Sequence, residues 1–194
     1  MTLAEDVARK LLLATSLPDE KVFFEKTIPM NTVVDYYRIA CNVLFVCEKC
    51  GTCCTTGNPI RLREEDIKRI SKHLKIPLNK AVKKYTIPDP NRQGTLNFKN
   101  ILPCKFYDPA LCTCKIYMAR PWSCRIFPFI GIYGSDKEVK VHEACKGSVK
   151  SVKALTDAIE KIRFETDSNA SKTPQLEMVK LAKQWFKDAL NSVI

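Results

Sequence analysis

The sequence carries four cysteines within eight residues, in the stretch Cys47-Glu48-Lys49-Cys50-Gly51-Thr52-Cys53-Cys54. Thiolates at positions i, i+3 and i+6 converge on one centre only if the backbone curls around it. Metal–thiolate bonds usually stabilise such a curl in a short loop. Buried or disulfide-bonded cysteines are the alternative interpretation, but the density of thiols in one loop favours metal ligation.

The chain as a whole has the composition of a globular protein. It contains 194 residues, of which 45% are hydrophobic, which suits one domain with flanking elaborations or at most two small domains. No run approaches the roughly 20 apolar residues of a membrane span. Residues 1–10 also lack the basic-then-apolar layout of a signal peptide. We therefore expect a cytoplasmic protein without a membrane partner, where ten cysteines indicate metal rather than a disulfide framework.

The net charge of +11 is concentrated in the middle of the chain. Residues 61–105 hold 12 basic and 4 acidic side chains, a balance of +8, against −1 for residues 1–60 and +4 for residues 106–194. A basic segment can attract nucleic acid, anionic lipid or an acidic protein. Aromatic residues and glycines do not alternate with these charges as in common RNA-binding modules. A solvated helix surface is therefore favoured, and we expect a protein partner or substrate rather than nucleic acid.

Helical patterns dominate the N-terminal part of the chain. Thr2 and Glu5 have the spacing of a capping box ahead of a predicted helix over residues 3–15. A second, short helix is expected within residues 19–26. Residues 31–46 fit either a strand or a buried helix, because periodicity alone does not distinguish the two.

The remaining elements alternate in type. In the middle, the pattern predicts an extended piece at 60–62, helices over 63–74 and after Pro77, an edge strand over 95–100 and a strand over 137–142. Apolar residues at helical spacing then predict one helix from residue 149 to 162 and another that begins at Thr173-Pro174.

Further cysteines follow in a second region of the chain. The turn residues Asp108 and Pro109 separate Cys104 from Cys114, so a hairpin-like loop should hold these two thiols close together. Cys41 precedes the dense loop without a close partner and is most simply a buried core thiol.

The spacing leaves iron–sulfur and zinc open, but it favours iron–sulfur. The run Cys47-x2-Cys50-x2-Cys53 matches the opening of the ferredoxin motif, in which three loop cysteines and a remote one hold a [4Fe–4S] cluster. A zinc ribbon would need two C-x2-C pairs, and the later cysteines are not so paired. Adjacent cysteines such as Cys53 and Cys54 are awkward ligands for one tetrahedral ion, so we expect two centres to meet there.

Ordered blocks of residues resemble the CxxCxxCC cysteine-cluster family, which is described as zinc- or iron-chelating. The resemblance covers residues 45–147. Its blocks are Cys47-x2-Cys50-Gly51-x-Cys53-Cys54, Asp66-Ile67, Pro103-Cys104-x-Phe106, Cys114-x-Ile116-Tyr117-x2-Arg120-Pro121-x2-Cys124-Arg125-x-Phe127-Pro128-Phe129, and Cys145.

The resemblance implies a set of site residues. The implied metal ligands are Cys47, Cys50, Cys53, Cys54, Cys104, Cys114, Cys124 and Cys145, which leaves Cys41 and Cys112 as extras. Arg120 and Arg125 are the candidate cofactor-binding side chains, since they can donate hydrogen bonds to cluster sulfurs or bind an anion; alternatively they only fix the loop. Flagellin lysine N-methylases look like relatives with this cysteine pattern.

Taken together, the patterns predict a mainly helical α+β fold, with short strands and cysteine-rich loops around a metal core. We expect an N-terminal helical segment (1–44), a metal-binding domain (45–147) and a C-terminal helical pair packed on it (148–194). The favoured function is an iron–sulfur protein with a redox or structural role. The alternatives are an S-adenosylmethionine-dependent protein lysine N-methylase and a zinc-binding module that contacts nucleic acid or protein.

Overall fold

The computed structural model describes residues 1–17, 22–23, 29–30, 33–56, 60–99, 102–129, 139, 141–167 and 175–193. Helices predominate, and the strands are short and antiparallel, so the predicted α+β class is confirmed. The chain forms two compact units, residues 1–46 with 127–194 and residues 47–126. The predicted three-part division stays a prediction. No helix in the described part of the chain is long and apolar enough to cross a membrane.

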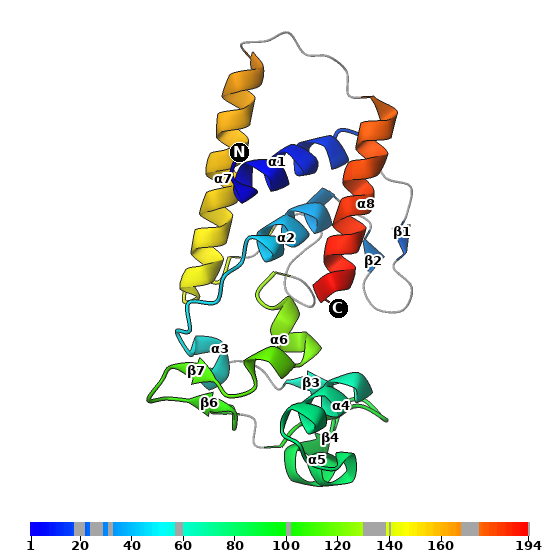
Figure 1. Ribbon diagram of the computed structural model, residues 1–194, viewed down its shortest axis with the longest axis vertical. Coiled ribbons are helices and arrows are strands. Elements are labelled where there is room, and N and C mark those ends of the chain that lie inside the picture. The colour runs from blue at the N-terminus through cyan, green and yellow to red at the C-terminus, as the bar shows by residue number, and fades with distance from the viewer. Residues whose placement is uncertain are drawn as a thin grey trace. The chain divides into compact units, whose positions relative to one another are not determined.

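The first unit is built from α1 (Leu3–Ala14), α2 (Val33–Val43), α7 (Lys146–Asp167) and α8 (Leu176–Val193). α1 crosses between α7 and α8 (Figure 1), and α2 contacts all three of them. Each helix buries one apolar stripe, as amphipathic helices do. Core side chains with less than a tenth of their surface exposed include Val7, Leu11, Ile39, Leu155, Ile162, Val179 and Phe186.

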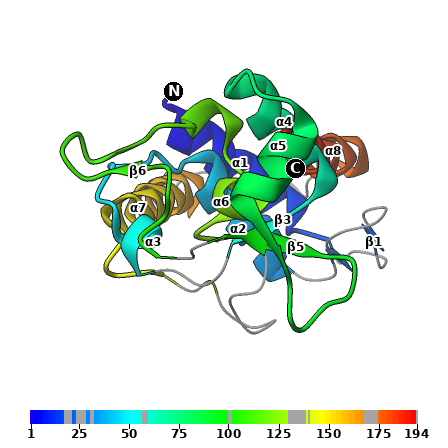
Figure 2. The same ribbon diagram turned by 90° about the horizontal axis from the view of Figure 1, so that it is seen from below.

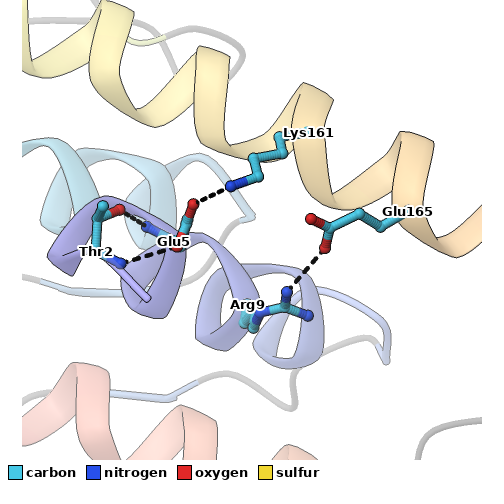
Figure 3. A network of polar contacts seen from close by, with 5 residues as sticks. All are labelled: Thr2, Glu5, Arg9, Lys161 and Glu165. Atoms are coloured by element: carbon cyan, nitrogen blue, oxygen red, sulfur yellow. Dashed lines mark hydrogen bonds and ion pairs between the residues drawn. The ribbon is translucent and has the colours of Figure 1, made fainter.

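The start of α1 has the predicted capping box, with Glu5 N–H donating to Thr2 Oγ1 and Thr2 N–H donating to Glu5 Oε2. The same helix is tied to α7 by two ion pairs (Figure 3). Lys161 Nζ lies 2.5 Å from Glu5 Oε1, and an Arg9 nitrogen lies 3.0 Å from Glu165 Oε2. The capped end of α1 is therefore also the part that binds α7.

In this unit the structure resolves one open prediction and corrects another. Residues 33–43 form a helix, since Tyr36 and Ile39 face the core beside Phe186, so helical packing decides the ambiguous segment. Val22–Phe23 is strand β1, paired antiparallel with β2 (Pro29–Met30), and not part of a short helix.

Two other predictions fall partly or wholly outside the residues that the structure describes. Residues 139, 141 and 142 are not in a strand, and the rest of the predicted strand over 137–142 lies outside the described residues. The predicted helix start at Thr173-Pro174 also lies outside them.

The second unit contains a three-stranded antiparallel sheet in the order β3-β5-β4. Its strands are β3 (Arg61–Leu62), β4 (Thr86–Pro88) and β5 (Leu96–Phe98). The segment 95–100 was expected at an edge, but β5 is the central strand, because it pairs with β3 on one side and β4 on the other. An alternating sequence pattern does not reveal how many neighbours a strand has, and here Asn97, between Leu96 and Phe98, is also buried.

Two helices pack side by side in this unit, α4 (Glu64–His73) and α5 (Leu78–Tyr85), as both views show (Figure 1 and Figure 2). They confirm the helices predicted over 63–74 and after Pro77. The helices, the sheet and the segment after it share one small core, made of Leu62, Ile67, Ile70, Ala81, Phe98, Phe106, Ile116 and Ala119. Cys104 and Cys114 pack against this core, so two of the predicted ligands lie at its edge.

Candidate metal centre

The dense cysteine loop turns at Gly51. This residue has a φ of +76°, a left-handed conformation that glycine adopts without steric cost. A Cβ at this position would lie 2.2 Å from the hydroxyl oxygen of Tyr107. After the turn, Cys54 N–H donates to the Gly51 carbonyl oxygen at 2.8 Å in the single helical turn α3 (Thr52–Thr55). Glycine here thus permits both the backbone turn and the close approach of the tyrosine.

The loop is joined directly to the second cysteine region. Cys104 N–H donates to the carbonyl oxygen of Cys54 at 2.6 Å. On α3, the sulfur atoms of Cys53 and Cys54 lie 3.9 Å apart. The structure thus places these residues, fifty positions apart in sequence, at one site.

A hairpin holds the next two thiols. Strands β6 (Tyr107–Asp108) and β7 (Thr113–Cys114) pair antiparallel, which confirms the hairpin expected between Cys104 and Cys114. Tyr107 N–H donates to the Cys104 carbonyl oxygen at 2.9 Å. The backbone at Phe106 and Tyr107 acts to lower the pKa of Cys104, and the backbone at Ile116 acts to lower that of Cys114, against the larger effect of burial. Interactions that lower a thiol pKa stabilise the thiolate, which is the metal-binding form of cysteine.

The fourth segment of the site is the short helix α6 (Trp122–Ile126), which carries Cys124. It is fixed by Asp66 of α4, a carboxylate only 1% exposed. Asp66 pairs with Arg69 and accepts the N–H of Trp122 at 2.9 Å. Ser123 adds a hydrogen bond from its hydroxyl to the Arg61 carbonyl oxygen at 3.0 Å. The position of Cys124 therefore depends on α4 and β3.

Together these segments assemble a set of four neighbouring thiols, Cys53, Cys104, Cys114 and Cys124, which we call the thiol quartet. Each member interacts electrostatically with the other three. Cys54 interacts with Cys53, Cys104 and Cys114. The structure therefore brings together five of the eight predicted ligands.

These thiols differ in how readily they lose a proton. Burial raises the pKa of Cys124, Cys104 and Cys114. The hydrogen bond between Cys53 and Cys54 lowers the pKa of Cys53 to about 7 and raises that of Cys54, with the charge of Arg120 also favouring the Cys53 thiolate. Cys53 is thus the thiol in which negative charge is most stabilised.

The thiols are neighbours without forming a closed ligand shell. None of the ten cysteines, all of which are described, is in a disulfide. Among the residues that the structure describes, no three histidine, cysteine or acidic side chains are spaced to hold a metal ion. An all-thiol donor set suits zinc or an iron–sulfur cluster. Metal binding displaces thiol protons, and the bound cation would offset the repulsion among the neighbouring thiolates that result.

The other predicted ligands have separate places. Cys50 and Cys54 both interact electrostatically with the Tyr107 phenol. Cys47 is half-buried, upstream of the turn. Cys145 belongs to the first unit, where it is buried and its N–H donates to the His142 carbonyl oxygen at 2.8 Å. The ligand set of eight stays a prediction.

The two extra cysteines differ from the quartet. Cys41 is 2% exposed, and burial raises its pKa to about 12, which confirms a core thiol. Cys112 is exposed, with a φ of +46° and its sulfur 3.6 Å from the Pro109 carbonyl oxygen.

The two predicted cofactor-binding arginines lie in different surroundings. Arg120 interacts with Cys53, Cys114 and Cys124, and its guanidinium stacks 3.8 Å from the centre of the Tyr117 ring. Arg125 instead lies among other arginines near Asp66. Their roles stay predictions.

Two residues that organise the site were given no role by the sequence patterns. Asp66 appeared only as part of a family block, although its place three residues after Arg63 gives the helix-start spacing that its carboxylate uses, accepting Arg63 N–H at 2.9 Å. Tyr107 carried no sequence signal, because its contact with Gly51 joins segments distant in sequence.

Comparison with known proteins identifies a family for the part of the chain that contains this site. Residues 46–146 match the CxxCxxCC family, under the description "Putative zinc- or iron-chelating domain". The chain belongs to the CxxCxxCC family. The match includes the whole thiol quartet, so this CxxCxxCC protein is a metal-binding cysteine-cluster protein.

One relative of this CxxCxxCC protein is an uncharacterized protein of Methanocaldococcus jannaschii. The two are 32% identical over 87 residues, which is 45% of this chain and 46% of the relative. The chain thus spans about half the length of this curated relative. No solved structure matches the chain.

Proposed function

We propose that this protein binds an iron–sulfur cluster, [4Fe–4S], through the thiol quartet, with a redox or structural role. The observation that carries the proposal is the quartet itself, in which four separate segments each bring one thiol into electrostatic contact with the other three. The ferredoxin-like spacing Cys47-x2-Cys50-x2-Cys53 favours iron–sulfur over zinc. Of that run only Cys53 belongs to the quartet, so Cys47 and Cys50 are further candidate ligands.

Elemental analysis of the full chain tests this proposal. Protein purified without oxygen should contain about four iron and four acid-labile sulfide per chain for one [4Fe–4S] cluster, with the visible absorption of an iron–sulfur chromophore. Zinc without sulfide would overturn the iron–sulfur assignment and leave the thiol site as a zinc site.

Single substitutions then test the quartet. Cys104→Ser, Cys114→Ser and Cys124→Ser should each lose most of the bound metal. Cys112→Ser is the matched control, since Cys112 is an exposed thiol in the same hairpin, and it should retain the metal. Full metal content in all three quartet variants would refute this ligand assignment.

We propose that this centre acts together with another protein, which is either a partner or a substrate. The methylase and nucleic-acid alternatives stay predictions from the sequence. Calorimetry with S-adenosylmethionine tests the first, and the salt dependence of nucleic-acid binding tests the second.

A further inference from the structure

A second group of charged side chains surrounds the buried carboxylate of Asp66, within the unit of residues 47–126. Arg69 forms an ion pair with this carboxylate. The guanidinium of Arg63 lies 3.8 Å from the centre of the Trp122 ring, whose backbone N–H donates to Asp66 at 2.9 Å. Arg125 completes the group, because it interacts electrostatically with Arg69, Asp66 and Arg63. We call Arg63, Arg69 and Arg125 the arginine group.

The arginine group has more positive charge than the carboxylate beside it can balance. Three guanidiniums face the single buried carboxylate of Asp66, a surplus of two positive charges (three minus one). Glu65 also interacts with Arg63, but it is exposed on the surface of α4. Like charges held this close repel one another, so an anion bound among them would relieve the repulsion.

Hydrogen-bond donors are in surplus as well. Within the described part of the chain, the buried Nε of Arg69 and the buried indole Nε1 of Trp122 have no hydrogen-bond acceptor. Buried donors are nearly always paired, because leaving one unpaired costs free energy. Since the side chain of Arg69 is 34% exposed, a small ligand can reach its outer face.

The arginine group borders the thiol quartet at Arg125, which follows Cys124 in sequence and interacts electrostatically with Arg120. Arg120 is the guanidinium that interacts with the thiols. Arg69 meets this residue only at its backbone, with a nitrogen 3.5 Å from the Arg120 carbonyl oxygen. Within the arginine group, the negative charge that the structure places among the guanidiniums is that of Asp66 and not of the thiols.

We propose that the arginine group binds a phosphate-type oxyanion, such as the phosphate group of a substrate or cofactor. Planar guanidinium forks bind phosphate oxygens in pairs. A phosphate carries a charge of about −1.5 to −2 near pH 7, which matches the surplus of two, whereas a carboxylate would leave one positive charge unbalanced. This site goes beyond metal ligation and does not depend on which metal is bound.

Isothermal titration of the metal-loaded full chain with inorganic phosphate, at constant ionic strength, tests the proposal. Saturable binding that is tighter for phosphate than for acetate is expected. Arg69→Lys keeps the charge beside Asp66 but removes the fork and its Nε–H, so it should weaken phosphate binding by about tenfold or more. Acetate binding as tight as phosphate, or unchanged phosphate affinity in Arg69→Lys, would overturn the proposal.

Three further variants complete this test. Arg63→Lys gives a second fork deletion in case Arg69→Lys folds poorly, and it should weaken binding in the same way. Glu65→Gln should tighten phosphate binding, because it removes the exposed carboxylate beside Arg63. Arg92→Gln, at an exposed turn of the same unit, should leave binding unchanged; an equal loss there would overturn a specific site in favour of general charge attraction.

Metal content measured on the same samples separates the two proposals. Protein that carries the metal but shows no saturable phosphate binding refutes only the arginine site. Folded protein that binds phosphate but carries no iron or zinc refutes only the metal proposal.

Discussion

The metal loop turns at Gly51, and two separate constraints require a glycine at this position. The left-handed backbone is one, and the close contact with the Tyr107 ring is the other. Gly94 offers a natural comparison. It has the same φ of +76°, but no neighbouring atom lies within 4 Å of the place that a Cβ would occupy.

Gly94→Ala should therefore cost only the left-handed strain, roughly 1–2 kcal/mol of unfolding free energy. Gly51→Ala should cost about 1–2 kcal/mol more, because the tyrosine ring must move aside as well. Denaturant titration of both variants measures the difference. In a Tyr107→Ala background the extra cost of Gly51→Ala should disappear; if it persists, the ring contact is not its cause.

Asp66 is the residue that positions the helix of Cys124. Asp66→Asn removes the charge that pairs with Arg69 while keeping one acceptor oxygen, so we expect a loss of about 2–4 kcal/mol of unfolding free energy and weaker metal retention. Denaturation and metal analysis give the two readouts. Asp157→Asn, which removes an exposed carboxylate of an i,i+4 pair on α7, should change stability by no more than about 0.5 kcal/mol; equal losses would contradict the positioning role of Asp66.

At the scale of elements, α1 and α7 are joined by a pH-sensitive contact. The hydrogen bond from Lys161, together with the N–H of Thr2, lowers the pKa of Glu5 below its ordinary value of about 4.5. A carboxyl with a lowered pKa in the folded state stabilises the fold above its unfolded pKa, and this stabilisation is lost as the pH falls through the folded pKa.

Lys161→Met should therefore lower the melting temperature more at pH 7 than at a pH below the lowered pKa of Glu5, where this carboxyl is protonated. Lys153→Met is the matched control, since it removes the same charge from an exposed pair within α7. Because the Lys161 side chain is also exposed to solvent, high salt should shrink its effect. Equal behaviour of the two variants would mean that the link between helices adds nothing beyond a local surface pair.

The two units differ in what holds them together. The first unit buries apolar stripes from four long helices, whereas the second has short strands, short helices and a small core bordered by thiols. Small units that lack a sufficient core usually depend on a metal or a disulfide.

Removal of the metal by a chelator should therefore raise amide hydrogen exchange mainly in residues 47–126. Helices α1, α2, α7 and α8 should stay protected, since their core contains no ligand of the thiol quartet. Exchange followed by peptide mass spectrometry makes the comparison within one sample. A uniform rise over both units would show that the metal stabilises the chain as a whole.

Much of this architecture is determined locally and can be read from the sequence. The capping box of α1 and the amphipathic stripes of α4 and α5 are periodic patterns, and the turn residues between Cys104 and Cys114 predicted the hairpin correctly. The cysteine blocks also identified the family and hence metal binding. These features depend on neighbours a few positions apart, which the sequence lists directly.

Contacts between distant segments decided the rest. The helical state of residues 33–43, the central place of β5 and the joining of Cys54 to Cys104 all depend on partners far along the chain. The sequence by itself determined that this protein gathers thiols for a metal. Only the tertiary structure selected four of them as mutual neighbours and set the arginine group beside them, because burial and charge act through space and not along the chain.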